Sequence, residues 1–182
     1  MMVSWMELWL PILLSTVLIF MASALMWMVL PHHRTDWQSM PNGERVQEVL
    51  KGVSPGQYIY PGIMKREERK DKEAQKRYQA GMGFVIVREP RFEMGKQMGS
   101  SFLYYLAVSF LVAYLAASTL SPGAEYMSVF RVVGTAAILA YAGAIAPNAI
   151  WWGNSWSSTI KNMFDGVVYG LLTAGVFAWL WP

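Results

Sequence analysis

The stretch STIKNMFDGVVYGLLTAG, residues 158–175, combines two charged side chains with an apolar run and regularly spaced small residues. Gly166, Gly170 and Ala174 recur every four positions, so they share one face of a helix. Helices in lipid associate by close van der Waals approach, and small side chains permit that approach. The stretch therefore predicts a membrane helix whose glycine-containing face packs against the backbone of another helix.

Two further segments carry small residues at the same spacing. One ridge consists of Ala136, Ala140 and Ala144, and the other consists of Ser109, Ala113 and Ala117. Three such ridges on consecutive apolar segments predict a tight helical bundle. The pattern leaves open whether the ridges pack within the chain or against a partner.

Four apolar segments are long enough to cross about 30 Å of hydrocarbon at about 1.5 Å per residue. They lie near residues 8–30, 102–120, 129–152 and 160–181. The last three are joined by short connections, which makes them antiparallel neighbours. We therefore predict an all-α membrane protein with four transmembrane helices. Its parts are a first helix in residues 1–30, a long mixed loop in residues 31–101 and a three-helix bundle in residues 102–182.

Lysine and arginine residues concentrate in that loop. Of the 15 in the chain, 13 lie between Pro31 and Ser101, and Lys161 lies in the connection before the last segment. Positive charge close to helix ends favours the cytoplasmic side of a membrane. The loop is therefore predicted to be cytoplasmic and both termini periplasmic.

The loop itself contains signals of local structure. Residues 42–52, NGERVQEVLKG, place valine and leucine on one face of a short amphipathic helix that ends at Gly52. Two strand-like runs, GQYIYPG (56–62) and GFVIVREP (83–90), are predicted to pair with each other. The stretch between them interleaves acidic and basic residues, which predicts a solvated helix and argues against nucleic-acid binding.

Asp165 is the carboxylate of greatest interest, because an acidic side chain near the membrane is costly unless it is paired. On the predicted topology it lies near the cytoplasmic boundary, close to His32 and His33 at the end of the first segment. One interpretation is a proton or divalent-metal site formed by these side chains, with Asp36 as a further candidate.

The alternative interpretation is a fixed interfacial ion pair of Asp165 with Lys161, Arg34 or a histidine. The short pattern HHRTD (32–36) lacks further ligand spacing, so we favour the structural pairing and assign no metal ligand. Arg131 lies near the opposite boundary, where we expect it to pair with an acidic residue or to extend its charged end into the interface.

The sequence lacks the residues that several kinds of chemistry require. It contains no cysteine, which excludes disulfides, thiolate metal sites and cysteine nucleophiles. No histidine lies in the middle of an apolar segment, so we expect no haem or chlorophyll ligand and no other cofactor. Phosphate-binding loops, serine-hydrolase motifs and zinc-protease motifs are also absent from the sequence.

Several longer stretches are distinctive: VLPHHRTDWQSMP (29–41), VSPGQYIYPG (53–62), FRVVGTAAILAYA (130–142) and, above all, IWWGNSWSSTIKNMFDGVVYGLLTAGVFAWLWP (150–182). Together they resemble a family of small bacterial four-helix integral membrane proteins, and the resemblance covers most of the chain. It implies a four-helix architecture in the bacterial inner membrane and no particular activity. The stretch AGMGFVIVREPRFE (80–93) departs from the shorter segment, richer in glycine and proline, that is expected there.

These observations favour a non-catalytic accessory or scaffold subunit of a larger membrane complex, for which a respiratory or photosynthetic complex is a reasonable host. The expected partners are other membrane subunits and the lipid bilayer, not nucleic acid. The alternative is a small transporter of ions, protons or metal that uses Asp165 with His32 and His33. A membrane enzyme is the least favoured hypothesis, because no nucleophile or metal set is recognisable.

Overall fold

The structure is a computed structural model that describes residues 3–62, 65–89, 91 and 93–182. The chain forms two compact units. The first, Met1–Trp37 with Glu93–Pro182, is a bundle of helices, and the second, Gln38–Phe92, is a small unit of helices and strands.

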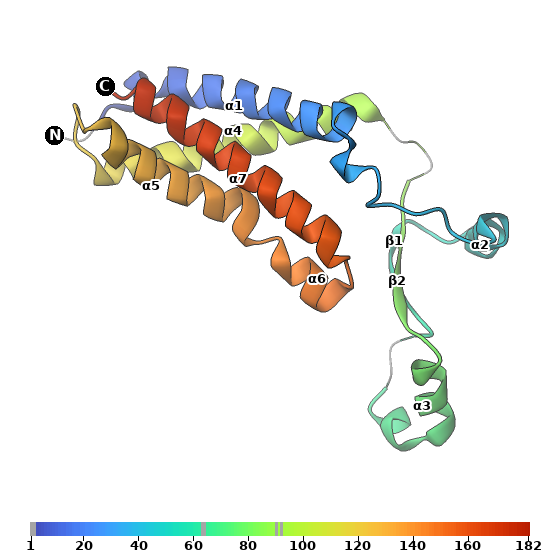
Figure 1. The fold of residues 1–182 in the computed structure, drawn as a ribbon. Coiled ribbons are helices and arrows are strands. Elements are labelled where there is room, and N and C mark those ends of the chain that lie inside the picture. Colours follow the sequence, from blue (N-terminus) through green and yellow to red (C-terminus); the bar gives the residue numbers. More distant parts are fainter. Residues whose placement is uncertain (1–2, 63–64, 90, 92) are drawn as a thin grey trace. The chain divides into compact units, whose positions relative to one another are not determined.

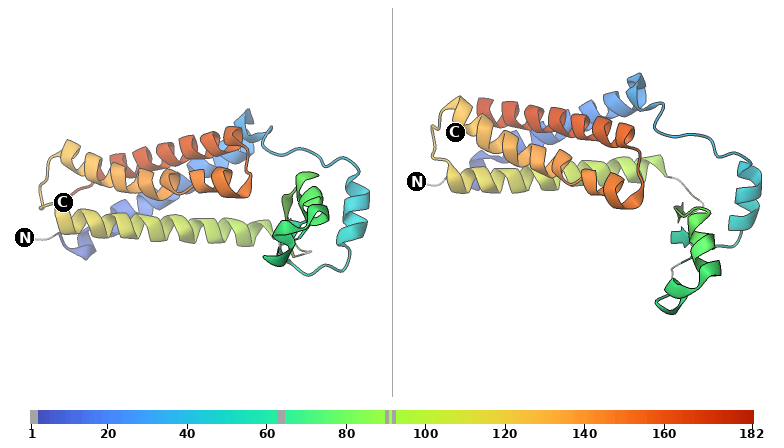
Figure 2. Two further views of the ribbon diagram at one scale, coloured as in Figure 1. Left: turned by 90° about the horizontal axis from the view of Figure 1, so that it is seen from below. Right: turned by 60° about the horizontal axis from the view of Figure 1, so that its bottom comes forward.

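The bundle is built from helices that run side by side (Figures 1 and 2). The helices are α1 (Trp9–Ala24), α4 (Met94–Thr119), α5 (Tyr126–Ile138), α6 (Ala146–Trp152) and α7 (Trp156–Trp179). A π-helical turn, Leu25–Val29, extends α1, and a second, Leu139–Gly143, follows α5. Short 3₁₀ turns occur at Trp5–Glu7 and Pro31–His33.

Three helical segments are long and apolar enough to cross a membrane: Trp9–Val29, Met94–Thr119 and Tyr126–Trp152. The prediction of a mostly helical chain with apolar helices long enough to span a membrane is thereby confirmed. Helix α4 begins at Met94, whereas the predicted span begins at Phe102. The first turns of the helix are polar and carry no hydropathy signal, so the prediction missed them.

The predicted ridge of α7 lies directly on the second half of α5 and on the backbone of the π turn that follows it. A Cβ atom added at Gly166 would lie 2.7 Å from the carbonyl oxygen of Tyr141, and one at Gly170 would lie 2.9 Å from the amide nitrogen of Ile138. Ala174 continues the contact, since its methyl group would lie 3.2 Å from a Cβ added at Gly134. Glycine at 166 and 170 is thus what lets the two helices approach to backbone contact.

The expected ridge on the third apolar segment differs from the face that is buried. Ala136 is half-buried, whereas Ala140 and Ala144 are exposed. The buried positions of this segment are Val129, Val133, Gly134, Ala137, Tyr141 and Ala142. The physical reason is that the α-helix ends at Ile138, so positions 140 and 144, in the π turn and the turn after it, do not continue an α-helical face.

The ridge on α4 faces the interior of the bundle. Ser109, Ala113 and Ala117 are all buried. The Ser15 hydroxyl on α1 donates to Oγ of Ser109 at 3.3 Å and also to the carbonyl oxygen of Ile12 at 3.1 Å. Small residues therefore bring α1 and α4 together with a polar contact between them.

The second unit contains α2 (Gly43–Leu50), β1 (Gly56–Tyr60), α3 (Lys72–Gln79) and β2 (Gly83–Val87). A 3₁₀ turn, Glu67–Lys70, precedes α3, and the Asp71 side chain caps that helix by accepting from the amide of Glu73. The two strands pair antiparallel, with Gly56 opposite Val87 and Tyr60 opposite Gly83. The pairing of the two strand-like runs is therefore as predicted.

The second unit buries very little apolar surface. Ala74 is its one fully buried hydrophobic side chain among the described residues, and no residue of α2 is buried. Val49 on α2 is 79% exposed and Ile86 on β2 is 69% exposed. The amphipathic face expected of α2 is thus present in the helix but is not covered by the described residues of the second unit.

Candidate functional site: a histidine–aspartate cluster

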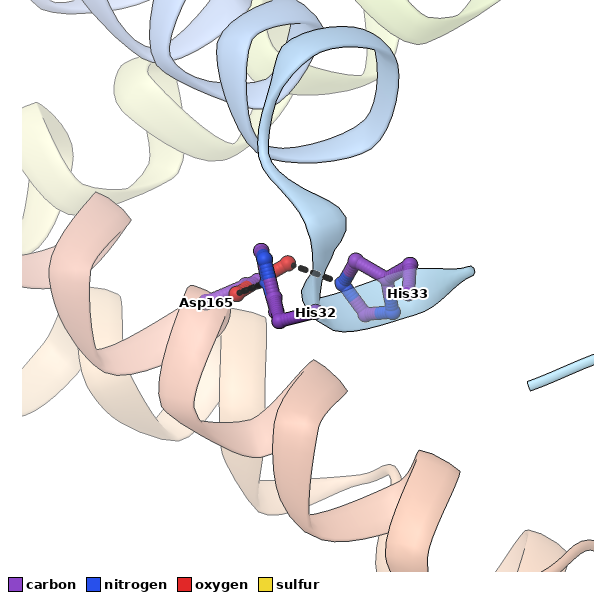
Figure 3. A group of neighbouring side chains, drawn as sticks. All are labelled: His32, His33 and Asp165. Atoms are coloured by element: carbon purple, nitrogen blue, oxygen red, sulfur yellow. Dashed lines mark hydrogen bonds and ion pairs between the residues drawn. The ribbon is translucent and has the colours of Figure 1, made fainter. Parts of the chain in front are cut away.

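The end of α1 brings both histidines of the chain to α7. The π turn Leu25–Val29 ends the helix, and Leu30 adopts an extended conformation. Pro31 then begins the 3₁₀ turn that carries His32 and His33, because its fixed φ suits the first position of a helical turn. The side chains of this turn meet Asp165, which projects from α7 (Figure 3).

Asp165 receives both imidazoles. Nε2 of His32 lies 3.1 Å from Oδ1 of Asp165, and Nε2 of His33 lies 2.8 Å from Oδ2. The carboxylate is 2% exposed, so these hydrogen bonds replace the water that it loses on burial. Two adjacent residues therefore share one carboxylate, one on each oxygen.

His33 bridges two carboxylates. Its Nδ1 atom lies 2.6 Å from Oδ2 of Asp36, and its ring stacks on Trp27 with centroids 4.0 Å apart. Burial alone would lower the pKa of His33, but hydrogen bonds to Asp36 and Asp165 and their negative charges outweigh it, so the pKa is raised. A charged ring that donates from both nitrogens is consistent with this geometry.

Asp36 joins the cluster to a second cation. Nζ of Lys161 lies 2.6 Å from Oδ1 of Asp36, and the Ser158 hydroxyl donates to Oδ2 at 3.1 Å. Burial would raise the pKa of Asp36, but these partners and His33 lower it to about 2. Lys161 also donates to the hydroxyl of Thr35 at 3.0 Å. The four groups form one continuous network, Lys161–Asp36–His33–Asp165, which His32 joins at Asp165.

The structure thus brings together some, but not all, of the residue pairs that the sequence predicted for this site. Asp165 meets the two histidines, as both interpretations allow. Lys161 pairs with Asp36 instead of Asp165, although it lies one turn away from Asp165 on the same helix. Trp27 and Ser158 were not predicted as members, and neither an indole nor a serine hydroxyl gives a sequence signal of that role.

Arg131 lies away from this cluster. It is exposed on α5, and among the described residues it makes no ion pair. The carboxylate of Glu7, an acidic residue near the same end of the bundle, accepts from the amide of Ser4 at 3.2 Å. The ion pair expected for Arg131 is therefore not seen among the described residues.

A groove reaches the cluster from one side. It has a volume of about 380 Å³ and is lined by Met26, Leu30, His32, Ile160, Lys161 and Phe164. The His32 side chain is 28% exposed, whereas those of His33 and Asp165 are each 3% exposed. His32 is therefore the most exposed of the three residues that meet at Asp165.

Tyrosine side chains form a second feature of the bundle interior. The rings of Tyr105, Tyr141 and Tyr169 pack edge to face, with each pair of centroids about 6 Å apart. Tyr169 lies one turn beyond Asp165 on α7. The rings fill the space where α4, α5 and α7 meet and give that region rigid aromatic packing.

The cluster offers two imidazole nitrogens and carboxylate oxygens in a buried position, so it can hold a cation or fix the chain after α1 onto α7. A comparison of the chain with protein families, with curated proteins and with solved structures finds no match.

Proposed function

We propose that this protein is a four-span integral membrane protein of the bacterial inner membrane that serves as a non-catalytic accessory subunit of a larger membrane complex. The observation that carries the proposal concerns the second unit, Gln38–Phe92, whose described residues include almost no buried apolar side chains. Other membrane subunits and the surrounding lipid are the partners.

The fourth span in this proposal is α7. Its 24 residues reach about 36 Å at about 1.5 Å per residue, enough to cross the hydrocarbon layer. Lys161 and Asp165 lie in its first three turns, and each is paired with an oppositely charged or hydrogen-bonding partner, which reduces the cost of placing them near lipid. The start of α1 and the end of α7 lie at the same end of the bundle, as an even number of spans requires (Figure 1).

The proposed orientation places residues 38–92 in the cytoplasm and both termini in the periplasm. It rests on the concentration of lysine and arginine beside the ends of α1 and α4. Reporter fusions test it: a cytoplasm-active reporter inserted within residues 38–92 is expected to be active, and a periplasm-active reporter at the C-terminus is expected to be active too. The reverse pattern would contradict the orientation.

The accessory role follows from the energetics of the second unit. An isolated two-stranded hairpin is marginally stable in water, and short helices need a packed face. Val49 and Ile86 present large apolar surface that nothing among the described residues of the second unit covers. A partner protein that covers these side chains would supply the missing core. The contact surface of that partner must be apolar at its centre and polar at its rim.

The test is purification of the native protein in a mild detergent, followed by identification of stoichiometric co-purifying subunits. We expect Val49→Glu to remove the partner while the protein still inserts in the membrane. Gln47→Glu is the matched control, because it adds the same charge at an exposed polar position of the same helix. A lone monomer or homo-oligomer from the unmodified protein would contradict the proposal.

A second candidate function, transport of an ion or proton, is favoured by one observation: the buried contact of Asp165 with both histidines near the end of the bundle. Buried ionisable groups at membrane depth often belong to ion pathways. Asp165→Asn in reconstituted vesicles is then expected to abolish flux while expression is retained. Unchanged flux would reject this candidate.

A further inference from the structure

We infer that Nε2 of His32, Nε2 of His33 and the carboxylate of Asp165 form a binding site for a divalent transition-metal ion of the Zn²⁺ type. One donor atom from each residue can be chosen so that all three lie within 4.8 Å of one another. Figure 3 shows the donors converging from two separate segments of the bundle. This inference is independent of the accessory role, because it needs no partner protein.

The distances are close to those of a coordinated ion. Ligands bound tetrahedrally at about 2.0–2.1 Å are about 3.3 Å apart from one another. The two nitrogen–oxygen distances, 2.8 and 3.1 Å, run to different oxygens of Asp165, so an ion between the rings takes both oxygens, or one oxygen after the carboxylate rotates, within a donor set no more than 4.8 Å across. The imidazole rings are tilted by 44° with centroids 4.1 Å apart, and both already direct Nε2 toward the same carboxylate.

The surroundings of His33 have the features of a metal ligand. A ligating histidine usually donates its other ring nitrogen to a carboxylate, which fixes the tautomer and the ring orientation. Asp36 accepts from Nδ1 of His33 at 2.6 Å, which leaves Nε2 as the coordinating atom. Asp36 is held in turn by Lys161 and Ser158, and the ring is held by Trp27. A simple ion pair between His33 and Asp165 does not require this second layer of support.

The donor set selects the kind of metal. Two imidazoles and one carboxylate suit Zn²⁺, Co²⁺, Fe²⁺ and related ions, whereas Mg²⁺ and Ca²⁺ prefer oxygen donors alone and Cu⁺ prefers sulfur. Three protein ligands leave a further coordination position. His32 is the most exposed of the three ligands, so that further position is expected on its side of the cluster.

The composition of the chain makes the test unusually clear. The sequence holds two histidines, both in this cluster, and no cysteine. Any imidazole nitrogen detected on a bound ion must therefore come from His32 or His33, provided that the protein is purified without a histidine tag.

The experiment is titration of the full-length protein in detergent with Co²⁺, followed by its d–d absorption and by competition with Zn²⁺. We expect one saturable equivalent with imidazole nitrogen in its coordination shell. Asp165→Asn and His33→Gln should lower the affinity at least 100-fold. Asp36→Asn, which removes only the support of His33, should lower it about 10- to 100-fold. Glu125→Gln, an exposed carboxylate outside the cluster, is the matched control and should change nothing.

The inference stays testable if the buried variants do not fold. His32 is part-exposed and makes one hydrogen bond, so His32→Gln is the least disruptive ligand substitution. The absence of saturable Co²⁺ binding by the unmodified protein would overturn the inference. Equal binding by His32→Gln and the unmodified protein would overturn it as well.

Discussion

Gly166→Ala is the substitution that tests the packing of the bundle most sharply. The added methyl carbon would lie 2.7 Å from the carbonyl oxygen of Tyr141, 2.8 Å from its carbonyl carbon and 2.9 Å from the amide nitrogen of Ala142. All three are backbone atoms of the π turn, so no side chain can rotate away from the new methyl group. The two helices must separate instead.

The size of the effect follows from these distances. Ordinary contacts of a Cβ atom begin near 3.4 Å, so the helices must move apart by about 0.7 Å at this point. Overpacking of this kind costs about 1–3 kcal/mol, while alanine gains up to about 1 kcal/mol over glycine in helix propensity. The propensity gain obscures the packing cost in a single measurement and has to be cancelled by a control.

Gly175→Ala supplies that control. Gly175 lies on the same helix, and a Cβ atom added there meets nothing within 4 Å. The two variants share the propensity gain, so their difference isolates the packing cost. We expect Gly166→Ala to be about 1–3 kcal/mol less stable than Gly175→Ala in reversible unfolding in mixed detergent micelles, followed by tryptophan fluorescence. Equal stability of the two variants would refute the backbone contact.

Two further predictions concern polar contacts of the bundle. Lys161→Met removes one of the two cationic partners of Asp36, and we expect a loss of about 1.5–3 kcal/mol in the same assay, whereas Lys96→Met, at an exposed position of α4, should have no effect. Ser109→Ala removes the hydroxyl contact between α1 and α4, with an expected loss of about 0.6 kcal/mol, whereas Ser118→Ala on the exposed face of α4 should be neutral. If a substitution and its control change the free energy of unfolding equally, the contact that the substitution removes does not contribute to stability.

The packing face of α7 could be predicted from the sequence, whereas that of the third segment could not. Two glycines four residues apart have few explanations other than close helix approach, and both lie on backbone. Alanine spacing is less specific, because alanine is tolerated equally on lipid-facing and buried faces. The π turn after Ile138 interrupts the α-helical period, and no residue pattern announces it. Gly134 was the better signal, since it faces Ala174.

The candidate site, too, could be predicted from the sequence only in part. The proximity of Asp165 to His32 and His33 followed from topology, since both lie near the same end of antiparallel segments. Adjacent residues on a helix or a strand point in different directions, so the sequence alone does not predict that both imidazoles reach one carboxylate. The 3₁₀ turn that begins at Pro31 presents both rings to α7. Lys161 pairs with Asp36 because both oxygens of Asp165 already face the histidines. This choice of partner depends on the tertiary structure, so the sequence did not predict it.

The most direct test of the central claim is amide hydrogen exchange on the chain purified alone in lipid nanodiscs. The claim is that the second unit requires a partner to be stable. We expect the amides of β1 and β2 to exchange within seconds to minutes, whereas those in the centres of α4 and α7 stay protected for hours or longer. Protection of both strands comparable to that of the bundle, in the absence of any other protein, would contradict the account.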